Sequence, residues 1–425
     1  MEMILDERRE TKDERISGMG MYKLGDLCSD VVDCPHSTPE WKNEGIRVIR
    51  NFNIVNGSLD FSNGFFVDEE TFEKRTQRAC PEFEDLVISR EAPMGAVCMI
   101  PKNLKCCLGQ RLVLLKVNKD VADPNYILFA IQSQFVQKQI QIINQTGSIV
   151  SNLNIPDLKS LRIPLPSLPE QKKIASVLSV LDDKIALNKK MNQKLEAMAK
   201  RLYDYWFVQF DFPDENGRPY KTTGGPMTYN PTLKREIPEG WEVKSLFDCS
   251  DVLYGFPYAT EPFDEENLDI STKPYPVIRI RDIKDNTISA KTTEIVDDRY
   301  RTKVNDLLIG MDGYFHMSFW PRNDDYVNQR ITRIRQKDLS IMVIYHQIAP
   351  FIKFKEDQAK GSTVGHLSDK DMKQINILVP NNPRLSEKFD GILNLITKNK
   401  QEISRLTALR DKLLPLLMNG QVVIE

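Results

Sequence analysis

Two long stretches of the chain carry hydrophobic residues at the spacing of a helix that pairs with another helix. From Pro169 onward, hydrophobic positions alternate in steps of four and three over more than four heptads. The members of this first series are Ile174, Leu178, Leu181, Ile185, Asn188, Asn192, Leu195, Ala199, Leu202 and Trp206. The spacing returns near the C-terminus, where each member stands 211 residues after its counterpart, as Leu385 does after Ile174. The second series is Leu385, Phe389, Ile392, Ile396, Asn399, Ile403, Leu406, Arg410, Leu413 and Leu417. We predict two helices that pair as an antiparallel coiled coil with pseudo-two-fold symmetry.

One polar position recurs at the same step of both series. Asn188 and Asn399 each lie close to the midpoint of the predicted helix. In an antiparallel pair related by a two-fold axis, residues at the midpoints meet. We therefore predict that Asn188 faces Asn399 and sets the register of the pair at some cost in stability.

The regions that precede the two helices also repeat, in the same order. Strand-like segments of the first region have counterparts in the second: GIRVIRNFNI (45–54) and YPVIRIRDI (275–283), EDLVISREAPMG (84–95) and NDLLIGMDGYFH (305–316), CLGQRLVLLKV (107–117) and YVNQRITRIRQ (326–336), TGSIVSNLNIPDLKSLRIPLP (146–166) and KGSTVGHLSDKDMKQINILVP (360–380). Residues 125–140 have helical spacing, and we expect Pro350 to interrupt the corresponding helix of the second region. The predicted fold is α+β, a tandem duplication of a globular α/β module followed by a long helix.

This repeat predicts the domain boundaries. Residues 211–240 contain nine Gly or Pro in thirty, which is typical of an extended, turn-rich linker. The expected parts are a charged N-terminal tail (1–20), a first globular domain (21–167), a central helix (168–208), a linker (209–240), a second globular domain (241–383), a distal helix (384–418) and a C-terminal tail (419–425).

Composition and charge narrow the class of protein. The formal net charge is −2, which excludes a protein that is basic throughout but leaves room for a local basic surface. The seven cysteines form no CxxC pair, and we expect them to be buried, reduced thiols of a cytoplasmic protein. No run of about 18 apolar residues predicts a membrane span, and the charged N-terminus lacks the apolar core of a signal peptide.

The residues of an active site are hard to find. No glycine-rich turn links a strand to a helix, no P-loop is present, and the four histidines have no metal-binding spacing. The Asn/Asp-Pro-Pro-aromatic tetrapeptide of amino-methyltransferases is absent. Asp157 and Lys159 could belong to a nuclease, but a capped helix start explains them more simply. We therefore expect a protein that binds a partner rather than one that transforms a substrate, and the sequence offers no metal site.

Two related domains held apart by a rod suit duplex DNA, where the major groove recurs about every 34 Å on one face. Arginine can read guanine and Asn or Gln can read adenine, while serine in a Gly-Ser loop can approach phosphates. An alternative for any one of these side chains is a solvated strand face, and Arg111 and Arg330 could instead form a structural salt bridge. The candidates are Arg47, Arg50, Asn51, Arg90, Gln110, Arg111 and Ser148 in the first domain, and Arg279, Arg281, Tyr314, His316, Gln329, Arg330 and Ser362 in the second.

Several segments together resemble the specificity subunit of type I restriction-modification systems. They are IPLPSLPEQKKIASVLSVLDDKI (163–185), DYWFVQF (204–210), GRPYKTTGG (217–225), IPEGWEV (237–243) and LRDKLLPLLMNGQVVI (409–424), and the resemblance covers nearly all of residues 21–425. The chain departs from the family where Asn381, Asn382 and Pro383 precede the distal helix in place of a Leu-Pro-Glu-Gln type of sequence.

The resemblance implies a non-catalytic subunit with two target-recognition domains, each of which reads one half of a bipartite, asymmetric DNA target. It implies that the coiled coil sets the gap between the half-sites and docks two modification (methyltransferase) subunits, which would bind S-adenosylmethionine and methylate adenine. Restriction (motor-nuclease) subunits would then join the complex. A stand-alone DNA-modifying enzyme with the same recognition architecture is the alternative from another class, and a purely structural coiled-coil scaffold is a third.

Overall fold

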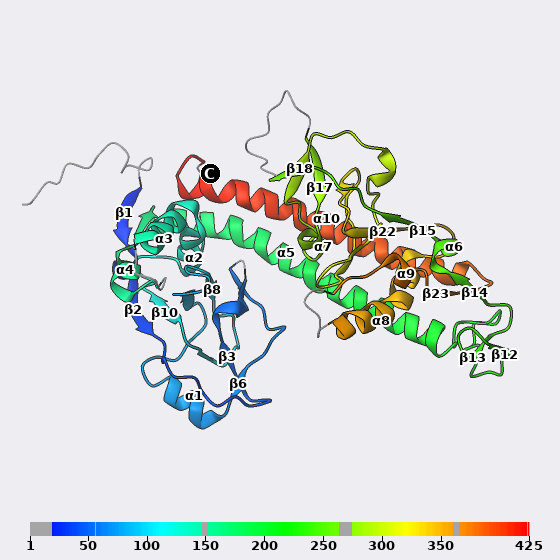
Figure 1. Cartoon of the computed structure of the whole chain (residues 1–425). Helices are drawn as coiled ribbons and strands as arrows, with labels where there is room; N and C mark the ends of the chain where they lie inside the picture. Colours follow the sequence, from blue (N-terminus) through cyan, green and yellow to red (C-terminus); the bar gives the residue numbers. More distant parts are fainter. Residues whose placement is uncertain are drawn as a thin grey trace, which may run out of the picture. The chain divides into compact units, whose positions relative to one another are not determined.

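The computed structural model describes residues 19–55, 57–146, 152–262, 274–359, 365–422 and 424. These residues form two compact units, one made of residues 1–184 with 406–425 and the other of residues 185–405. They are called unit 1 and unit 2 below (Figure 1). The predicted tail lies outside the described residues except for its last two positions, and the first strand begins at Gly20.

Two long helices contribute to both units. Helix α5 spans Leu168–Tyr203 and continues as a π-helical turn over Asp204–Val208, and α10 spans Arg384–Met418. Every member of the two predicted hydrophobic series is buried or half-buried, so the periodicity identified the packed face of each helix correctly. The Asn382 side chain accepts a hydrogen bond from the Arg384 N–H at 3.1 Å, so an asparagine caps α10 where the family sequence differs.

Unit 1 contains a four-stranded antiparallel sheet in the order β2-β10-β7-β8 and a three-stranded sheet in the order β6-β3-β9. Strands β3 and β9 run parallel, and β1 pairs with β11. The elements are β1 Gly20–Lys23, β2 Cys28–Asp33, β3 Ile46–Ile49, β4 Ile54–Val55, β5 Ser58–Leu59, β6 Phe66–Val67, α1 Glu69–Arg75, β7 Leu86–Ser89, β8 Val97–Met99, β9 Cys106–Leu108, β10 Leu112–Val117, α2 Pro124–Gln132, α3 Gln134–Thr146, α4 Ile155–Ser160 and β11 Arg162–Leu165.

Unit 2 repeats this topology. Its sheets have the orders β15-β22-β19-β20 and β16-β18-β17-β21, β17 and β21 run parallel, and β14 pairs with β23. The elements are β12 Met227–Asn230, β13 Arg235–Pro238, β14 Glu242–Ser245, α6 Leu246–Cys249, β15 Ser250–Tyr254, β16 Glu261–Pro262, β17 Tyr275–Ile278, α7 Ile280–Ile283, β18 Ala290–Thr292, β19 Leu307–Gly310, β20 Met317–Phe319, β21 Tyr326–Val327, β22 Ile331–Gln336, α8 Ile341–Ala359, α9 Asp369–Met372 and β23 Asn376–Val379.

Details of the two copies agree as well. Asp85 binds the ammonium group of Lys116 at 2.9 Å, and at the matching position of unit 2 Asp306 binds Arg335 at 2.7 Å. Both aspartates are buried and are preceded by a residue in the left-handed region, Glu84 in one unit (φ 71°) and Asn305 in the other (φ 72°). The tandem duplication predicted from the sequence is therefore present in topology and in buried ion pairs.

The predicted helix break at Pro350 was wrong. Helix α8 runs through Pro350 without a break, whereas the corresponding segment of unit 1 divides into α2 and α3. Ser133 is extended between these two helices, and its hydroxyl donates to the carbonyl of Ala130 at 2.6 Å. A proline removes one backbone donor, which a helix tolerates when packing holds it in place, and Ile348 and Ile352 on either side of Pro350 are buried.

The predicted linker is a folded part of unit 2. Its strands β12 and β13 form a hairpin, and Phe210 and Phe212 are buried. The rings of these two residues lie 5.7 and 5.0 Å from the ring of Trp241. Glycine and proline in this segment therefore shape turns of a packed structure, because the aromatic residues between them anchor it to the core.

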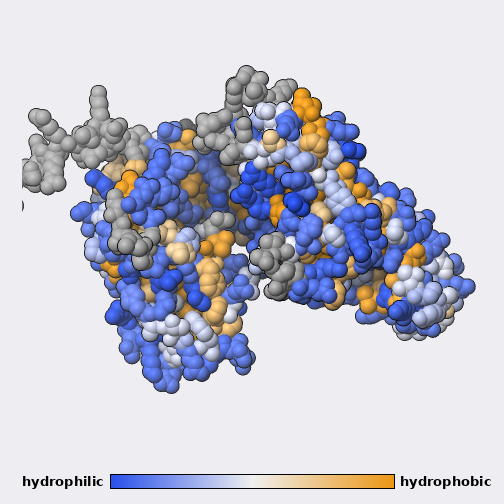
Figure 2. Space-filling view, in the orientation of Figure 1, coloured by the Kyte–Doolittle hydropathy of each residue, from blue (hydrophilic) through white to orange (hydrophobic). Residues whose placement is uncertain are grey.

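The surface and the cysteines agree with the sequence analysis in most respects. Figure 2 shows a mainly hydrophilic surface in which hydrophobic residues form small patches. Among the described residues, no helix is both long and apolar enough to cross a membrane. All seven cysteines are free; five are buried, Cys28 is half-buried and Cys80 is exposed, against the expectation that all would be buried.

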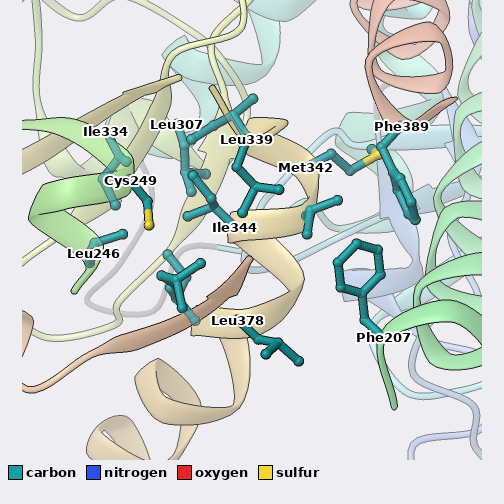
Figure 3. Packing of buried hydrophobic residues seen from close by; sticks show 14 of the residues in the cluster. Phe207, Leu246, Cys249, Leu307, Ile334, Leu339, Met342, Ile344, Leu378 and Phe389 are labelled. Atoms are coloured by element: carbon teal, nitrogen blue, oxygen red, sulfur yellow. The ribbon is translucent and has the colours of Figure 1, made fainter. Parts of the chain in front are cut away.

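The core of each unit joins a sheet to the long helices. In unit 1, side chains of β7 and β10 pack with Leu178 of α5 and Leu417 of α10. In unit 2, Leu307 and Ile334 of the sheet belong to one cluster with α8 and the long helices (Figure 3). Phe207 and Phe389 of that cluster face one another, with ring centroids 5.9 Å apart. Each sheet is therefore fixed to its own part of the helix pair by buried hydrophobic surface.

The two helices run antiparallel in both units, as predicted. In unit 1, Asp182 of α5 binds Arg410 of α10 at 3.0 Å, while Leu178 packs beside the later Leu417. In unit 2, Asn192 of α5 lies opposite Ile396 and Asn399 of α10.

The predicted partner of Asn399 was wrong by one helical turn. Its side-chain N–H donates to Oδ1 of Asn192 at 2.8 Å, and Asn192 in turn donates to the carbonyl of Ile396 at 3.2 Å. Asn188 is buried, with 3% of its surface exposed. Two-fold symmetry alone does not set the register, because large side chains near the helix ends also pack together. Here the Trp206 ring packs on Phe389 at 6.0 Å and helps to fix the register.

The Asn192–Asn399 hydrogen bond gives a test of this register. We expect Asn399→Leu to lower the free energy of unfolding by about 1–3 kcal/mol, because it leaves the buried Asn192 oxygen without its donor. Replacement of both residues by leucine should restore most of that loss. Chemical denaturation of the single and double variants measures this, with Lys398→Leu on the exposed face of α10 as the control. A double variant as unstable as the single one would contradict the assigned contact.

His346 of α8 provides a second stability test. Its ring stacks on Tyr203 at 5.1 Å and meets the ring of Tyr345 edge-on at 5.2 Å, and its Nε2 has no hydrogen-bond partner among the described residues. Burial, with a smaller effect of Lys200, lowers the pKa of His346 to about 4. Because the unfolded chain keeps a value near 6.5, the unfolded state takes up the proton first as the pH falls. The stability that the neutral ring contributes is complete above pH 6.5 and is lost towards pH 4.

We therefore expect the free energy of unfolding to fall by about 2 kcal/mol between pH 7 and pH 5 through this residue. Chemical denaturation at both pH values checks the effect. His346→Phe, which removes the titrating group and keeps an aromatic ring, should flatten this part of the pH dependence. An unchanged slope in that variant would show that another group is responsible.

Candidate nucleic-acid interface

In unit 1, three loops that follow different strands meet at one edge. The carbonyl of Ile49 at the end of β3 accepts from the Gly109 N–H at 2.7 Å, which brings the turn before β10 beside β3. The carbonyl of Arg111 in that turn accepts from the Arg90 N–H at 2.8 Å, which adds the loop after β7. Arg111 has a left-handed φ of 68°. This turn directs an arginine towards the loop after β7.

The candidate side chains of unit 1 make contacts across these loops. Arg111 Nε lies 3.0 Å from Oε2 of Glu91, and the Asn51 side chain donates to the carbonyl of Ala92 at 2.7 Å. Gln110 donates to the carbonyl of His36. The salt bridge that the sequence left open for Arg111 is thus present, although 54% of this side chain remains exposed. Asn51 and Arg111 lie on one loop cluster.

Two further arginines of unit 1 are held on aromatic rings. The Arg50 guanidinium lies 4.7 Å from the Phe65 ring centroid and also faces Phe52 and Trp41. Arg47 lies 4.7 Å from the ring of Phe61. Cation–π contacts of this kind fix the plane of a guanidinium without using its N–H donors. Both arginines are half-buried and keep donors for another partner.

Arg90 has a different position. Its side chain is 10% exposed, binds both oxygens of Asp33 at 2.9 Å and donates from Nε to the carbonyl of Leu153. These contacts satisfy most of its donors inside unit 1. Arg90 therefore supports the loop cluster and is set apart from the DNA contacts proposed below.

Unit 2 repeats the arrangement of loops with the same backbone hydrogen bonds. Asn328 N–H donates to the carbonyl of Ile278 at 3.3 Å, and Met311 N–H donates to the carbonyl of Arg330 at 3.0 Å. Arg330 lies 3.4 Å from Asp312, as Arg111 lies beside Glu91 in unit 1. The loop after β17, the loop after β19 and the turn before β22 therefore meet as their counterparts do.

These loops surround an open hollow of about 690 Å³, called the unit 2 hollow below. Five of the seven candidates predicted for this domain line it, together with Lys284 and Asp312. The five candidates are Arg279, Arg281, Tyr314, His316 and Arg330. The lining includes four cationic side chains and one carboxylate, so the hollow has an excess of positive charge in a chain of formal net charge −2. Such a local basic surface attracts phosphate groups.

Tyr314 lines the unit 2 hollow on a loop that is anchored at two places. The residue is 68% exposed, and its ring stacks on His316 with the ring planes 18° apart. The loop is anchored where the Asp312 carboxylate lies 2.7 Å from His366 and where the Gly313 N–H donates to the carbonyl of Gly365 at 3.0 Å. Gly313 has a φ of 72°, which a side chain would disfavour.

The remaining candidates are placed as follows. Arg279, which also donates to the Thr260 hydroxyl, is the N-cap residue before α7, and Gln329 is exposed next to Arg330. Ser148 and Ser362 lie outside the described residues. Asp157 belongs to a capped helix start, since its N–H donates to the Asn154 side chain at 2.8 Å, in agreement with the simpler interpretation.

Sequence reasoning missed Lys284, Glu91 and Asp312. The two acidic residues occupy the same step of the repeated segments, and that recurrence was a signal that could have identified them. No pattern in the sequence points to Lys284. Its place in the hollow depends on how the chain turns directly after α7. Among the described residues no group of three metal-binding side chains is present.

Comparison with known proteins identifies similar chains. The family described as the type I restriction modification DNA specificity domain matches residues 16–197 and 238–408. The specificity subunit of the type I restriction enzyme MjaIX from Methanocaldococcus jannaschii is 27% identical over 378 residues, which cover 84% of this chain and 82% of that protein. The HindI specificity subunit from Haemophilus influenzae is 22% identical and covers 74% of this chain and 81% of that protein.

A solved structure shares the fold. The S subunit of a type I restriction-modification system from M. genitalium superposes with a TM-score of 0.54 at 20% identity. The match covers 94% of this chain and 96% of that one.

Proposed function

This chain belongs to the type I restriction-modification DNA specificity family, and from this membership we propose that it is the non-catalytic subunit that selects the DNA sequence for a type I complex. Each unit binds one half of a bipartite, asymmetric target in duplex DNA. The observation that carries the proposal is the repeated loop cluster, which places Arg50 and Arg111 in unit 1 and Arg279 and Arg330 in unit 2 at matching positions.

The helix pair gives the second part of the proposal. Antiparallel α5 and α10 belong to both units, so they separate the two half-sites by a fixed, unread gap. Their exposed faces include Val180, Leu187 and Met198 of α5 and Leu409 of α10. In this proposal the exposed surface of the helix pair, which combines these apolar residues with polar ones, is where the other subunits dock.

The expected partners are two modification subunits, which carry S-adenosylmethionine and the residues that methylate adenine. Restriction subunits complete the complex where they are present. This chain supplies no cofactor, and it acts in the cytoplasm, where its free thiols stay reduced.

A methylation assay tests this division of labour. We expect this chain mixed with a type I modification subunit to transfer methyl groups to DNA adenine, while neither protein does so alone at a comparable rate. The alternative of a stand-alone modifying enzyme gives the opposite result. Methyl transfer by the purified chain alone would overturn the proposal.

A further inference from the structure

The duplication allows the two recognition surfaces to be compared residue by residue. Backbone hydrogen bonds at matching places join the same three loops in both units. At these places some side chains are identical: Arg50 and Arg279, Gln110 and Gln329, Arg111 and Arg330. Their acidic partners, Glu91 and Asp312, are also equivalent.

Other side chains on the same loops differ in chemistry. Asn51 and Phe52 follow the first arginine in unit 1, whereas Ile280 and Arg281 follow it in unit 2. By the pairing of β7 with β8 and of β19 with β20, His316 takes the place of an alanine. The loop after β7 carries no aromatic residue, whereas the loop after β19 presents Tyr314.

A bipartite, asymmetric target gives a reason for this difference. Its two halves share a sugar–phosphate backbone but differ in base sequence. Phosphate contacts position a protein without carrying sequence information, and contacts to base edges specify the sequence. Side chains that are identical in the two units suit what the halves share, and side chains that differ suit what distinguishes them.

The geometry of Arg111 and Arg330 fits contact with the backbone. Each holds a carboxylate through part of its guanidinium, and each side chain is more than half exposed. Exposed salt bridges stabilise a fold very little, so stability alone does not account for their recurrence. An arginine has five donors, and those that the carboxylate leaves free can bind phosphate oxygens.

The geometry of the differing side chains in unit 2 fits base contact. Arg281, Tyr314 and His316 all line the unit 2 hollow and come from two separate loops. Tyr314 is largely exposed, yet its loop is anchored through Asp312 and Gly313. A large, exposed ring on an anchored loop has less freedom to lose on binding than one on a free loop.

We propose that Arg281, Tyr314 and His316 read the bases of one half-site, while Arg330 and its counterpart Arg111 hold the DNA backbone in the two halves. This inference rests on the proposed function and assigns separate roles to residues of the same surface.

Binding assays with the chain in complex with its modification subunits test the assignment. DNA duplexes with the complete target, with single base changes in either half, and with no target serve as probes. We expect Arg281→Ala and Tyr314→Ala to weaken binding to the target on the order of 5- to 150-fold and to leave binding to target-free DNA unchanged. Discrimination should be lost at particular base pairs of one half-site only.

Arg330→Ala and Arg111→Ala are the matched variants for the backbone role. We expect each to weaken binding to every duplex by a similar factor. The slope of log affinity against log salt concentration should fall by about 1 in both. Base preference in both half-sites should stay as in the wild type.

The outcomes separate this inference from the proposed function. A wild-type complex without sequence preference would overturn both. A specific wild type in which Tyr314→Ala and Arg281→Ala weaken all duplexes alike, or in which Arg330→Ala changes the preferred bases, would overturn this inference alone. Thermal unfolding of each variant complex, expected to match the wild type, shows whether a loss of binding reflects misfolding.

Discussion

A matched four-residue insertion in the two long helices is expected to lengthen the unread gap of the target by about two base pairs. The insertion sites are after Lys184 in α5 and before Leu406 in α10, where unit 1 gives way to unit 2. Four residues add about 6 Å to a helix, and base pairs are spaced about 3.4 Å apart. Both half-sites should remain unchanged, because the residues on the recognition loops are untouched.

The insertion should change which DNA sites are methylated, instead of only reducing the methylation activity. Methylation of the original target should fall by several orders of magnitude, while sites with the longer gap become methylated. The same four residues inserted after Gly217, in an exposed turn of unit 2, are the control and should change nothing. Normal methylation with an unchanged gap in the helix variant would remove the spacer role.

Exchange of residues 21–167 for the corresponding region of another family member is expected to change one half-site completely. This region has its own sheets and helices, and α5 begins immediately after it at Leu168. The other half-site and the gap should be retained, since unit 2 and both long helices stay the same. Mapping of methylated adenines in cells that express the chimaera measures all three properties at once.

Exchange of residues 241–383 is the reciprocal experiment and should change the other half-site. A chimaera in which both halves or the gap change would contradict the independence of the two units. The exchanged domain must still pack on the long helices, because Leu178 of α5 and Leu417 of α10 belong to the core of unit 1. Both residues lie outside the exchanged region and are preserved in each chimaera.

The sequence predicted the duplicated fold because the relevant signals are local and periodic. The hydrophobic series of α5 and α10 identified the buried faces of both helices, and strand-like segments such as 45–54 and 275–283 became matching strands. The partner of Asn399 was missed because register depends on the packing of Trp206 against Phe389, which periodicity alone does not contain.

The candidate interface was predicted in composition but not in arrangement. Arg279, Arg281, Tyr314, His316 and Arg330 were chosen for their side-chain chemistry, and the structure brings them around one hollow. The separate position of Arg90 depends on Asp33, fifty-seven residues away in the chain, and no local pattern indicates that pair. The buried aromatic residues that fold the predicted linker were visible in the sequence but were outweighed by its glycines and prolines.

The most direct test of the central claim is a map of methylated adenines in a cell that expresses this chain with a type I modification subunit. The account predicts one motif made of two short, different specific parts, separated by a gap of fixed length and methylated in both parts. The map should be empty when either protein is omitted. A single continuous motif, or two identical halves, would contradict the account.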